Sequence, residues 1–320
     1  MTTQPAQLAL DWAQAGRKVA LATVVETWGS APRGVGSQLV IDADGAMEGS
    51  VSGGCVEGAV VVAAIDAIAA GKHAILDFGV SDDEAFAVGL ACGGQIRVLV
   101  QPVGDGLTLA TLQALAEARA AARPIGLATD LATGSSRIIT AEDAPDRFRL
   151  DRAGLEEDGT FITLQNPPLR LIIVGAVHIA QPLVGMARAC GYAPVLIDPR
   201  GAFGSAARFP GETIVEDWPD EALAALKPDA RTAIVTLTHD PKLDDPAIMA
   251  ALGSDVFYLG CLGSTRTHAK RVARLQAAGF TEGQIARIHA PVGLDIGGRQ
   301  PAEIALSIMA QITQVLRQAR

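Results

Sequence analysis

Residues 169–198 read LRLIIVGAVHIAQPLVGMARACGYAPVLID, and this stretch decides the fold of the C-terminal half. An aliphatic run from Leu169 to Val174 comes directly before Gly175, and a helical segment follows this glycine. A second apolar run, Pro194 to Ile197, then ends at Asp198. A strand, a glycine turn, a helix and a second strand in this order are typical of a βαβ unit with parallel strands.

The remainder of this half continues the alternation of strand and helix. Aliphatic runs at Thr232–Leu237 and Val256–Leu259 are each followed by a loop and an amphipathic segment, and the chain closes with a predicted helix, Pro301–Arg317. Such alternation indicates a parallel sheet with helices on both faces. The sequence therefore predicts an α/β protein with a Rossmann-type, doubly wound parallel sheet in its C-terminal half.

The N-terminal half predicts a mixed α/β domain. A continuous apolar run from Lys18 to Thr27 is typical of a buried strand, and the segment Ala59–Ala70 is long enough for a helix. Residues 131–159 contain a turn at 133–136 and a polar stretch that ends at Gly159, which we assign to an α+β annex of this domain. Because Asn166-Pro167-Pro168 is a strong local breaker, we expect an N-terminal domain at 1–165, with a core at 1–103 and an annex at 104–165, and a Rossmann-like domain at 166–320.

Composition excludes several classes of protein. The 320 residues carry a formal net charge of −9, which opposes the phosphate attraction on which nucleic-acid binding depends. No apolar run is long enough for a membrane span, and the first residues do not resemble a secretory leader, so we expect a cytoplasmic protein. The four cysteines form no CxxC pair, and free thiols are the expectation. They are Cys55, Cys92, Cys190 and Cys261.

The first turn of the C-terminal half partly fits a dinucleotide fingerprint. Gly175, Ala180 and Asp198 stand where the pattern needs two small residues and a ribose-binding acid. Val177 replaces the middle glycine, which puts NAD(P) binding in doubt. Two hypotheses remain: the turn binds a nucleotide or a pterin phosphate, or its small residues only allow the helix to pack closely on the strand.

Polar residues also gather where the predicted parallel strands end. Four of the five histidines, His178, His239, His268 and His289, lie in or near such positions. The loop Gly260–Arg266 enters a helix, so Ser264 and Arg266 can cap an anion, or Ser264 can serve as a plain N-cap.

Glycine and cysteine occur together twice in the N-terminal half. Gly53 and Gly54 place Cys55 at the predicted start of a helix, where amide dipoles stabilise a thiolate that can attack, carry sulfur or ligate a metal. Cys92 precedes Gly93 in a similar string. Inert, buried cysteines are the alternative for both.

One further residue is a candidate ligand. Arg33 stands in the glycine-rich loop Trp28–Ser37, where its guanidinium can bind a phosphate through two N–H groups or simply lie exposed.

Three strings together resemble the xanthine dehydrogenase accessory factor family, XdhC/CoxI. They are ETWGSAPR at 26–33, GSVSGGCVE at 49–57 and CGG at 92–94. The resemblance extends through the second half, where residues 175–180, 198–200 and 293–297 are similar to the Rossmann domain of that family.

This resemblance implies an accessory factor rather than a turnover enzyme. Members bind molybdenum cofactor (molybdopterin), hold it while a cysteine desulfurase supplies a sulfido ligand, and deliver it to a xanthine dehydrogenase-type molybdenum hydroxylase. They are usually homodimers. The resemblance implies roles in the chemistry for Cys55, a possible molybdenum ligand, and for Cys92. Cofactor contacts are expected from Arg33, Gly53, Gly54, Gly93, Gly175, His178, Asp198, His239, Ser264 and Arg266.

Two other hypotheses start from the Rossmann half. The first is an NAD(P)-dependent oxidoreductase with His178 or His239 as acid or base and Asp198 on the ribose. The second is a nucleotide-sensing module without chemistry, whose first domain only mediates assembly.

Overall fold

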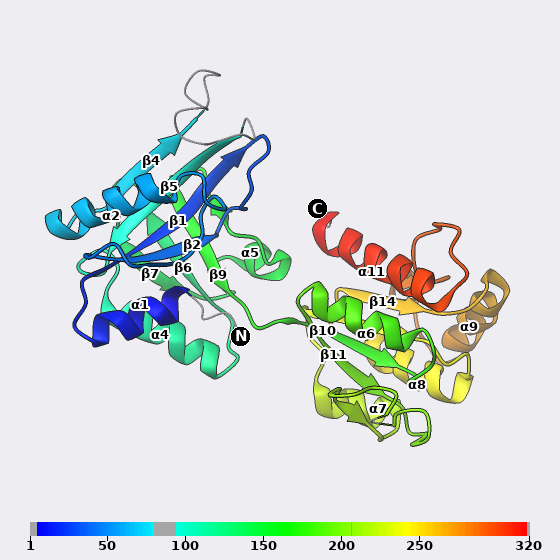
Figure 1. The fold of residues 1–320 in the computed structure, drawn as a ribbon. Helices are drawn as coiled ribbons and strands as arrows, with labels where there is room; N and C mark the ends of the chain where they lie inside the picture. The colour runs from blue at the N-terminus through cyan, green and yellow to red at the C-terminus, as the bar shows by residue number, and fades with distance from the viewer. Residues whose placement is uncertain (1–4, 80–93, 206, 319–320) are drawn as a thin grey trace. The chain divides into compact units, whose positions relative to one another are not determined.

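A computed structural model of the chain describes residues 5–79, 94–205 and 207–318. The chain divides into two compact units, Met1–Pro167 and Pro168–Arg320 (Figure 1).

The N-terminal unit is built on a five-stranded antiparallel sheet in the order β3-β2-β1-β5-β4. Its strands are β1 (Val19–Trp28), β2 (Gln38–Asp42), β3 (Met47–Gly49), β4 (Ala74–Phe78) and β5 (Gln95–Pro102). Helix α2 (Glu57–Ala70) packs on one face of this sheet.

The central strand β1 is buried on both faces. Ala20, Ala22 and Val24 belong to the core shared with α2, whereas Leu21 and Val25 belong to cores on the opposite face. Side chains of a strand alternate between the two faces, so a strand that is covered on both needs an unbroken apolar run. This requirement explains the run of aliphatic residues in the sequence.

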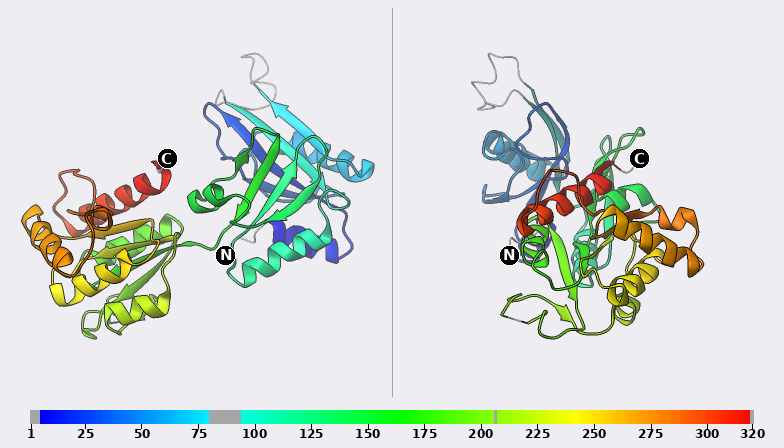
Figure 2. Two further views of the ribbon diagram at one scale, coloured as in Figure 1. Left: turned by 180° about the vertical axis from the view of Figure 1, so that it is seen from behind. Right: turned by 90° about the vertical axis from the view of Figure 1, so that its right-hand side faces the viewer.

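Residues 104–165, together with residues 5–14, cover the opposite face. A second antiparallel sheet has the order β7-β6-β9-β8. Its strands are β6 (Ile125–Asp130), β7 (Ser136–Ile139), β8 (Gly154–Leu155) and β9 (Thr160–Gln165), and the helices of this side are α1 (Pro5–Gln14), α4 (Leu109–Ala120) and α5 (Pro145–Leu150). Figure 2 shows these strands from behind.

The polar stretch up to Gly159, for which the sequence indicates no individual elements, is structured. The stretch contains β7, α5 and β8, and its buried residues Ile139 and Phe148 pack together in a small core of their own. These elements are two to six residues long, too short to show a period in sequence, and they are held by tertiary contacts.

The C-terminal unit contains six parallel strands in the order β12-β11-β10-β13-β14-β15. They are β10 (Leu169–Val174), β11 (Tyr192–Ile197), β12 (Ile214–Val215), β13 (Thr232–Thr236), β14 (Tyr258–Cys261) and β15 (Ile288–His289). The order corresponds to 3-2-1-4-5-6, the arrangement of the doubly wound dinucleotide-binding fold.

Helices cover both faces of this sheet. Helices α6 (Ala180–Ala189) and α11 (Pro301–Gln318) share one core with it. The other core involves α7 (Pro219–Leu226), α8 (Pro241–Leu252), α9 (Thr265–Ala277) and α10 (Glu282–Ile285). The predicted fold class, a mixed α/β half followed by a Rossmann-type parallel sheet, is confirmed.

Phe161 tests the packing between the two N-terminal sheets, because its ring is 1% exposed and packs with Val25 and Leu99. We expect Phe161→Ala to lower the free energy of unfolding of this unit by about 3–5 kcal/mol, through lost burial and an unfilled cavity. Urea unfolding followed by tryptophan fluorescence in a Trp218→Phe background confines the signal to the N-terminal unit. Val62→Ala, at a side chain 61% exposed on α2, is the matched control and should change stability by about 0.5 kcal/mol or less.

Candidate functional site

The cysteine loop, residues 50–56, is ordered around the carboxylate of Glu57. This side chain belongs to a residue only 6% exposed at the start of α2. Its oxygens accept hydrogen bonds from the Ser50 hydroxyl at 2.8 Å and from the backbone amides of Val51, Ser52 and Gly54 at 3.2, 2.9 and 2.9 Å. The Ser52 hydroxyl is a further donor to Glu57.

The two serine hydroxyls extend this network to the rest of the loop. Ser50 Oγ accepts the Gly53 amide at 2.8 Å, and Ser52 Oγ accepts the amides of Cys55 and Val56 at 3.0 and 2.9 Å. Every backbone N–H from Val51 to Val56 therefore has an acceptor inside the loop or on Glu57. The loop holds no spare amides for an anion, although its glycine-rich sequence suggests such a role.

The network also fixes the charge of Glu57. Burial by itself raises the pKa of this carboxyl, but the hydrogen bonds from Ser52 and Ser50 outweigh it and lower the pKa to about 2. Glu57 is thus an anion throughout the physiological pH range, and it is the hydrogen-bond acceptor that holds the loop in place.

Gly53 and Gly54 permit the course of the loop before Cys55. Their φ angles are 77° and 113°, a region that residues with a Cβ atom rarely occupy. Cys55 follows them, lies half-buried against the core of α2, and comes two residues before the first residue of this helix. The thiol therefore lies at the N-terminal end of α2, as the sequence predicts.

The other N-terminal motifs lie beside this loop. A Cβ atom built on Gly53 would be 3.6 Å from the side chain of Pro32, and one built on Gly94 would be 2.5 Å from the carbonyl oxygen of Ser30. The structure thus brings the loop of residues 29–37 against the cysteine loop and against the start of β5. Arg33 is exposed in that loop. Cys92 and Gly93 lie outside the described residues.

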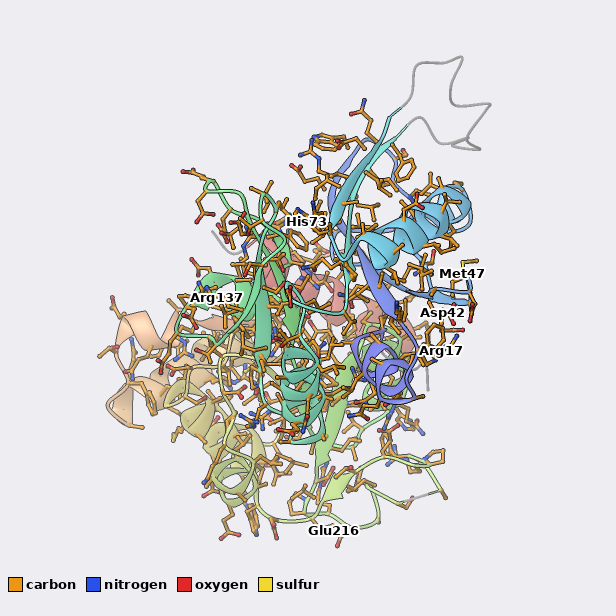
Figure 3. The ribbon with its side chains drawn as sticks, turned by 90° about the vertical axis from the view of Figure 1, so that its left-hand side faces the viewer. Arg17, Asp42, Met47, His73, Arg137 and Glu216 are labelled. Atoms are coloured by element: carbon orange, nitrogen blue, oxygen red, sulfur yellow. The ribbon has the colours of Figure 1, made fainter. Side chains whose placement is uncertain are left out.

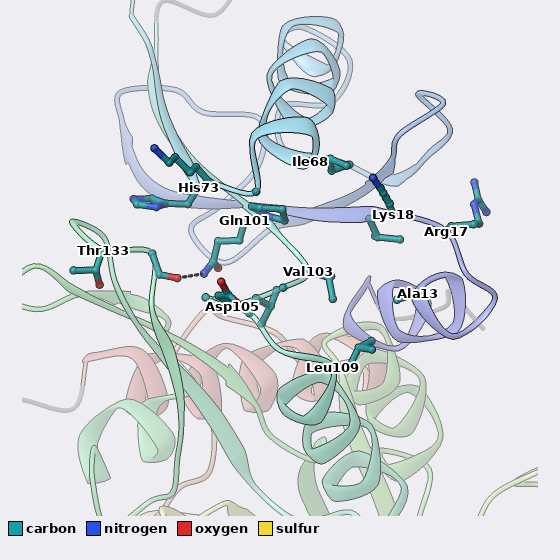
Figure 4. A pocket seen from close by; sticks show the side chains of 18 residues that line it. Ala13, Arg17, Lys18, Ile68, His73, Gln101, Val103, Asp105, Leu109 and Thr133 are labelled. Atoms are coloured by element: carbon teal, nitrogen blue, oxygen red, sulfur yellow. Dashed lines mark hydrogen bonds between the residues drawn. The ribbon is translucent and has the colours of Figure 1, made fainter.

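A cavity of about 670 Å³ in the same unit is separate from the predicted site residues. Its polar lining comes from the ends of α1 and α2 and from the loop after β5, and includes Lys18, Lys72 and His73 (Figure 4). Arg17 also lines it, but its guanidinium is paired with the buried Asp42. Figure 3 labels both residues. These basic residues are scattered through the sequence, so no local motif indicates the cavity.

In the C-terminal unit, the strand order reverses between β10 and β13, the position where doubly wound folds bind ligands. The turns after these two strands touch: a Cβ atom on Gly175 would lie 2.6 Å from Thr238 Cγ2. Gly175 also has a φ of 106°, so both its backbone and its neighbour exclude a side chain. His178 and His239 are exposed in these two turns, and His239 has a φ of 61°.

Asp198 supports the first turn from within the protein. It is fully buried, and its oxygens accept the Ala176 amide at 2.8 Å, the Arg200 amide at 3.0 Å, and the Arg200 Nε and Nη2 at 2.8 Å each. Burial raises the pKa of Asp198, but the contacts with Arg200 and Ala176 lower it overall. Each oxygen already has two donors, so a ribose hydroxyl would have to displace one. Val177 packs against the core next to α6.

Ser264 and Arg266 differ in what they contact. Ser264 Oγ accepts a hydrogen bond from the Thr267 amide at 3.2 Å, so Ser264 is the N-cap of α9. This contact corresponds to the plain N-cap that the sequence offers as the alternative to anion binding. Arg266 is exposed and lines a hollow of about 500 Å³ together with His239. The same hollow is lined by Asp244 and Arg271, which sequence reasoning missed because an isolated charged residue on a helix gives no sign that it is buried.

The last two candidate histidines, His289 and His268, are surrounded by other parts of the fold. His289 stacks on Tyr258 with ring centroids 4.8 Å apart, and burial lowers its pKa. Burial also lowers the pKa of His268.

Metal clusters and membrane spans are absent from the described ranges. Across residues 5–79, 94–205 and 207–318, no group of three or more His, Cys, Asp or Glu side chains is placed to hold a metal ion. Within the same ranges no helix is long and apolar enough to cross a membrane.

Comparison with known proteins gives matches over nearly the whole chain. Residues 171–312 match the sequence model of the XdhC Rossmann domain, and residues 12–79 match that of the XdhC and CoxI family. The chain is 30% identical over 309 residues to the molybdenum cofactor insertion chaperone PaoD of Escherichia coli K12, covering 97% of this chain and 87% of that protein.

Two further relatives come from Bacillus. The chain is 27% identical over 311 residues to a Bacillus subtilis protein named as a probable xanthine dehydrogenase subunit, covering 92% of each chain. It also superposes on a crystal structure described as a xanthine dehydrogenase from Bacillus halodurans, with a TM-score of 0.73, 26% identity and coverage of 99% and 97% of the two chains.

The charge of Glu57 predicts a specific pH dependence of stability. Its pKa is about 2 in the folded protein and 4.5 ordinarily, so its contribution is present above pH 4.5 and is lost as the pH falls toward 2. We expect Glu57→Gln to destabilise the N-terminal unit by on the order of 3 kcal/mol at pH 7, because an amide NH2 group replaces one acceptor oxygen.

Urea unfolding between pH 3 and 7 measures this effect. The difference in unfolding free energy between the unaltered chain and Glu57→Gln should be constant above about pH 5.5 and shrink below pH 4.5. Glu48→Gln, at an exposed residue of β3, is the matched control. A difference that stays constant down to pH 3 would show that the charge of Glu57 does not organise the loop.

Proposed function

The chain belongs to the XdhC and CoxI family, and from this premise we propose that it binds molybdenum cofactor, supports its sulfuration and delivers it to a xanthine dehydrogenase-type molybdenum hydroxylase. The cofactor is cargo in this proposal, and the protein is an accessory factor rather than a turnover enzyme. The named function of the E. coli relative supports the insertion role.

The observation that carries the proposal is the cysteine loop. Because Glu57, Ser50 and Ser52 occupy all six amides of residues 51–56, the group that the loop offers to a ligand is the thiol of Cys55. Sulfur is a soft donor that suits a sulfur-rich metal centre. A thiolate can also attack the outer sulfur of a desulfurase persulfide, which forms a persulfide on Cys55 and leaves the desulfurase cysteine as a thiol. The chemistry of this donor fits the cargo.

Neighbouring groups fit the same task. Gly53 and Gly54 leave the backbone bare next to Cys55, so a bulky pterin can approach it closely. Arg33 stands in the adjacent loop and supplies a cation for the phosphate of the pterin. Cys92 belongs to the same proposal, because the family resemblance of its CGG string gives it a role in the chemistry.

Partners are part of the proposal. A cysteine desulfurase supplies the sulfur and a molybdenum hydroxylase receives the cofactor, so both must reach the cysteine loop. Trp28 is 45% exposed directly before Gly29 of the neighbouring loop, and exposed tryptophans are enriched at protein interfaces. We propose that this residue contacts a partner, that the protein acts as a homodimer, and that it does so in the cytoplasm.

Retention of the cofactor tests the proposal. We expect the protein purified from cells with an intact molybdenum-cofactor pathway to contain pterin, detected by fluorescence after oxidation. Cys55→Ala should reduce the pterin content at least tenfold, equivalent to about 1.4 kcal/mol or more of lost binding, because the sulfur contact is removed. Cys92→Ala should also reduce it.

Cys190→Ala is the matched control, since Cys190 is exposed at the end of α6 and should leave the pterin content unchanged. Equal pterin in Cys55→Ala and the unaltered chain would refute the role of the loop, and absence of pterin from every variant would refute the carrier function.

A further inference from the structure

A cationic hollow lies in the C-terminal unit next to α8 and α9. These two helices, labelled in Figure 1, follow β13 and β14 in the chain. The volume of the hollow is about 500 Å³, and four of its lining residues are cations of α9: Arg266, Lys270, Arg271 and Arg274. Arg266 and Lys270 are four positions apart on this helix, and like charges at this spacing destabilise it. A bound anion would relieve that repulsion.

Arg271 is the most unusual group of the hollow. It is 2% exposed, and its Nη2 donates to the carbonyl oxygen of Leu262 at 3.0 Å. Its Nε and Nη1 have no hydrogen-bond partner within the described residues. The facing carboxylate, Asp244, is also 2% exposed and comes only to 3.8 Å from Nη2, with its Oδ2 likewise unpartnered in the described part of the chain.

Unmade hydrogen bonds on buried, charged groups are costly and rare in native proteins. Arg271 lines the hollow, so an acceptor bound there would supply the hydrogen bonds that its Nε and Nη1 lack. The guanidinium has N–H donors free on two of its nitrogens, and its planar fork matches the oxygens of a phosphate.

The charge balance of the hollow favours an anion. Arg274 is neutralised by Asp245, with contacts of 2.5 and 2.9 Å, whereas no ion pair to Arg266 or Lys270 occurs among the described residues. Among the described residues, Asp244 is the carboxylate that lines the hollow. Burial raises its pKa, although the Thr238 hydroxyl at 2.6 Å and Arg271 oppose this shift. The raised pKa reduces the negative charge that would repel an anion.

We propose that this hollow binds the phosphate group of a phosphorylated small molecule, with Arg271 as the buried anchor and Arg266 and Lys270 as cations at its rim. The location agrees with the general rule that ligands of doubly wound sheets bind outside the carboxyl ends of the strands. The inference rests on the proposed function only for the identity of the ligand, which is the cofactor cargo or a separate nucleotide. Either source presents the same phosphate chemistry.

Calorimetric titration of the full chain tests the site, with inorganic phosphate, pyrophosphate and ADP as probes at one ionic strength. Replacing the buried Arg271 leaves Asp244 unpaired and destabilises the domain, so the rim residues are the informative variants. We expect Lys270→Ala and Arg266→Ala each to weaken binding of at least one probe roughly tenfold. Lys242→Ala, an exposed lysine of α8 that does not line the hollow, should change it by about twofold or less.

A fourth variant is expected to strengthen phosphate binding rather than weaken it. Asp244→Asn removes the negative charge facing Arg271 while keeping an acceptor for Thr238, so it should tighten phosphate binding roughly threefold or more. Absence of binding for all three probes, or an equal loss in Lys242→Ala and Lys270→Ala, would overturn the proposal.

Pterin content after co-expression then separates the two sources. A loss of pterin in Lys270→Ala with Cys55 intact assigns the site to the cargo. Unchanged pterin together with ADP binding that depends on Lys270 assigns it to a nucleotide. If no variant ever contains pterin while the phosphate titrations succeed, the carrier function fails and the phosphate site stands.

Discussion

The carboxylate of Glu57 is the interaction on which the N-terminal site depends. This buried anion accepts hydrogen bonds from three backbone amides and two hydroxyls, and the hydroxyl oxygens accept hydrogen bonds from three more amides. A loop with consecutive glycines has a large conformational entropy when free, so a strong internal acceptor is needed to hold it in one conformation. The low pKa of Glu57 and the fixed position of Cys55 are two consequences of the same hydrogen bonds.

A comparable arrangement holds the first turn of the C-terminal unit. Asp198 accepts the Ala176 amide below the turn and is itself held by Arg200, while Gly175 leaves room for Thr238 of the neighbouring turn. In a nucleotide-binding fold an acid at the end of the second strand contacts the ribose. Here the same position is occupied by internal hydrogen bonds, so the fold keeps the fingerprint residue but uses it for support. The anion-binding capacity of the unit lies instead next to the strand after the reversal point, where cations of α9 gather.

The sequence predicts the C-terminal fold well because its signals are local. An aliphatic run, a glycine with a left-handed backbone at Gly175 and a following helix are visible within a few residues of one another. The short elements between residues 131 and 159 escape notice because Ile139 and Phe148 become core residues only through contacts distant in sequence. Glu57 stands in the most specific motif, yet its role emerges only when five donors are seen to converge on it. Arg271 gives no signal at all, since burial of a charged residue on a polar helix is a property of its tertiary surroundings.

The backbone amides of the cysteine loop are hydrogen-bonded within the protein itself, and this affects how a carrier holds and releases its cargo. A loop ordered by its ligand must lose conformational entropy at the moment of binding, whereas a loop ordered by Glu57 has met that cost during folding. Binding can then rely on few contacts, such as one thiol and a nearby cation, and still be effective. Few contacts also mean that the cargo is released without unmaking an extended array of hydrogen bonds. A preorganised loop with a single reactive group therefore suits transfer to a second protein better than a deep pocket would.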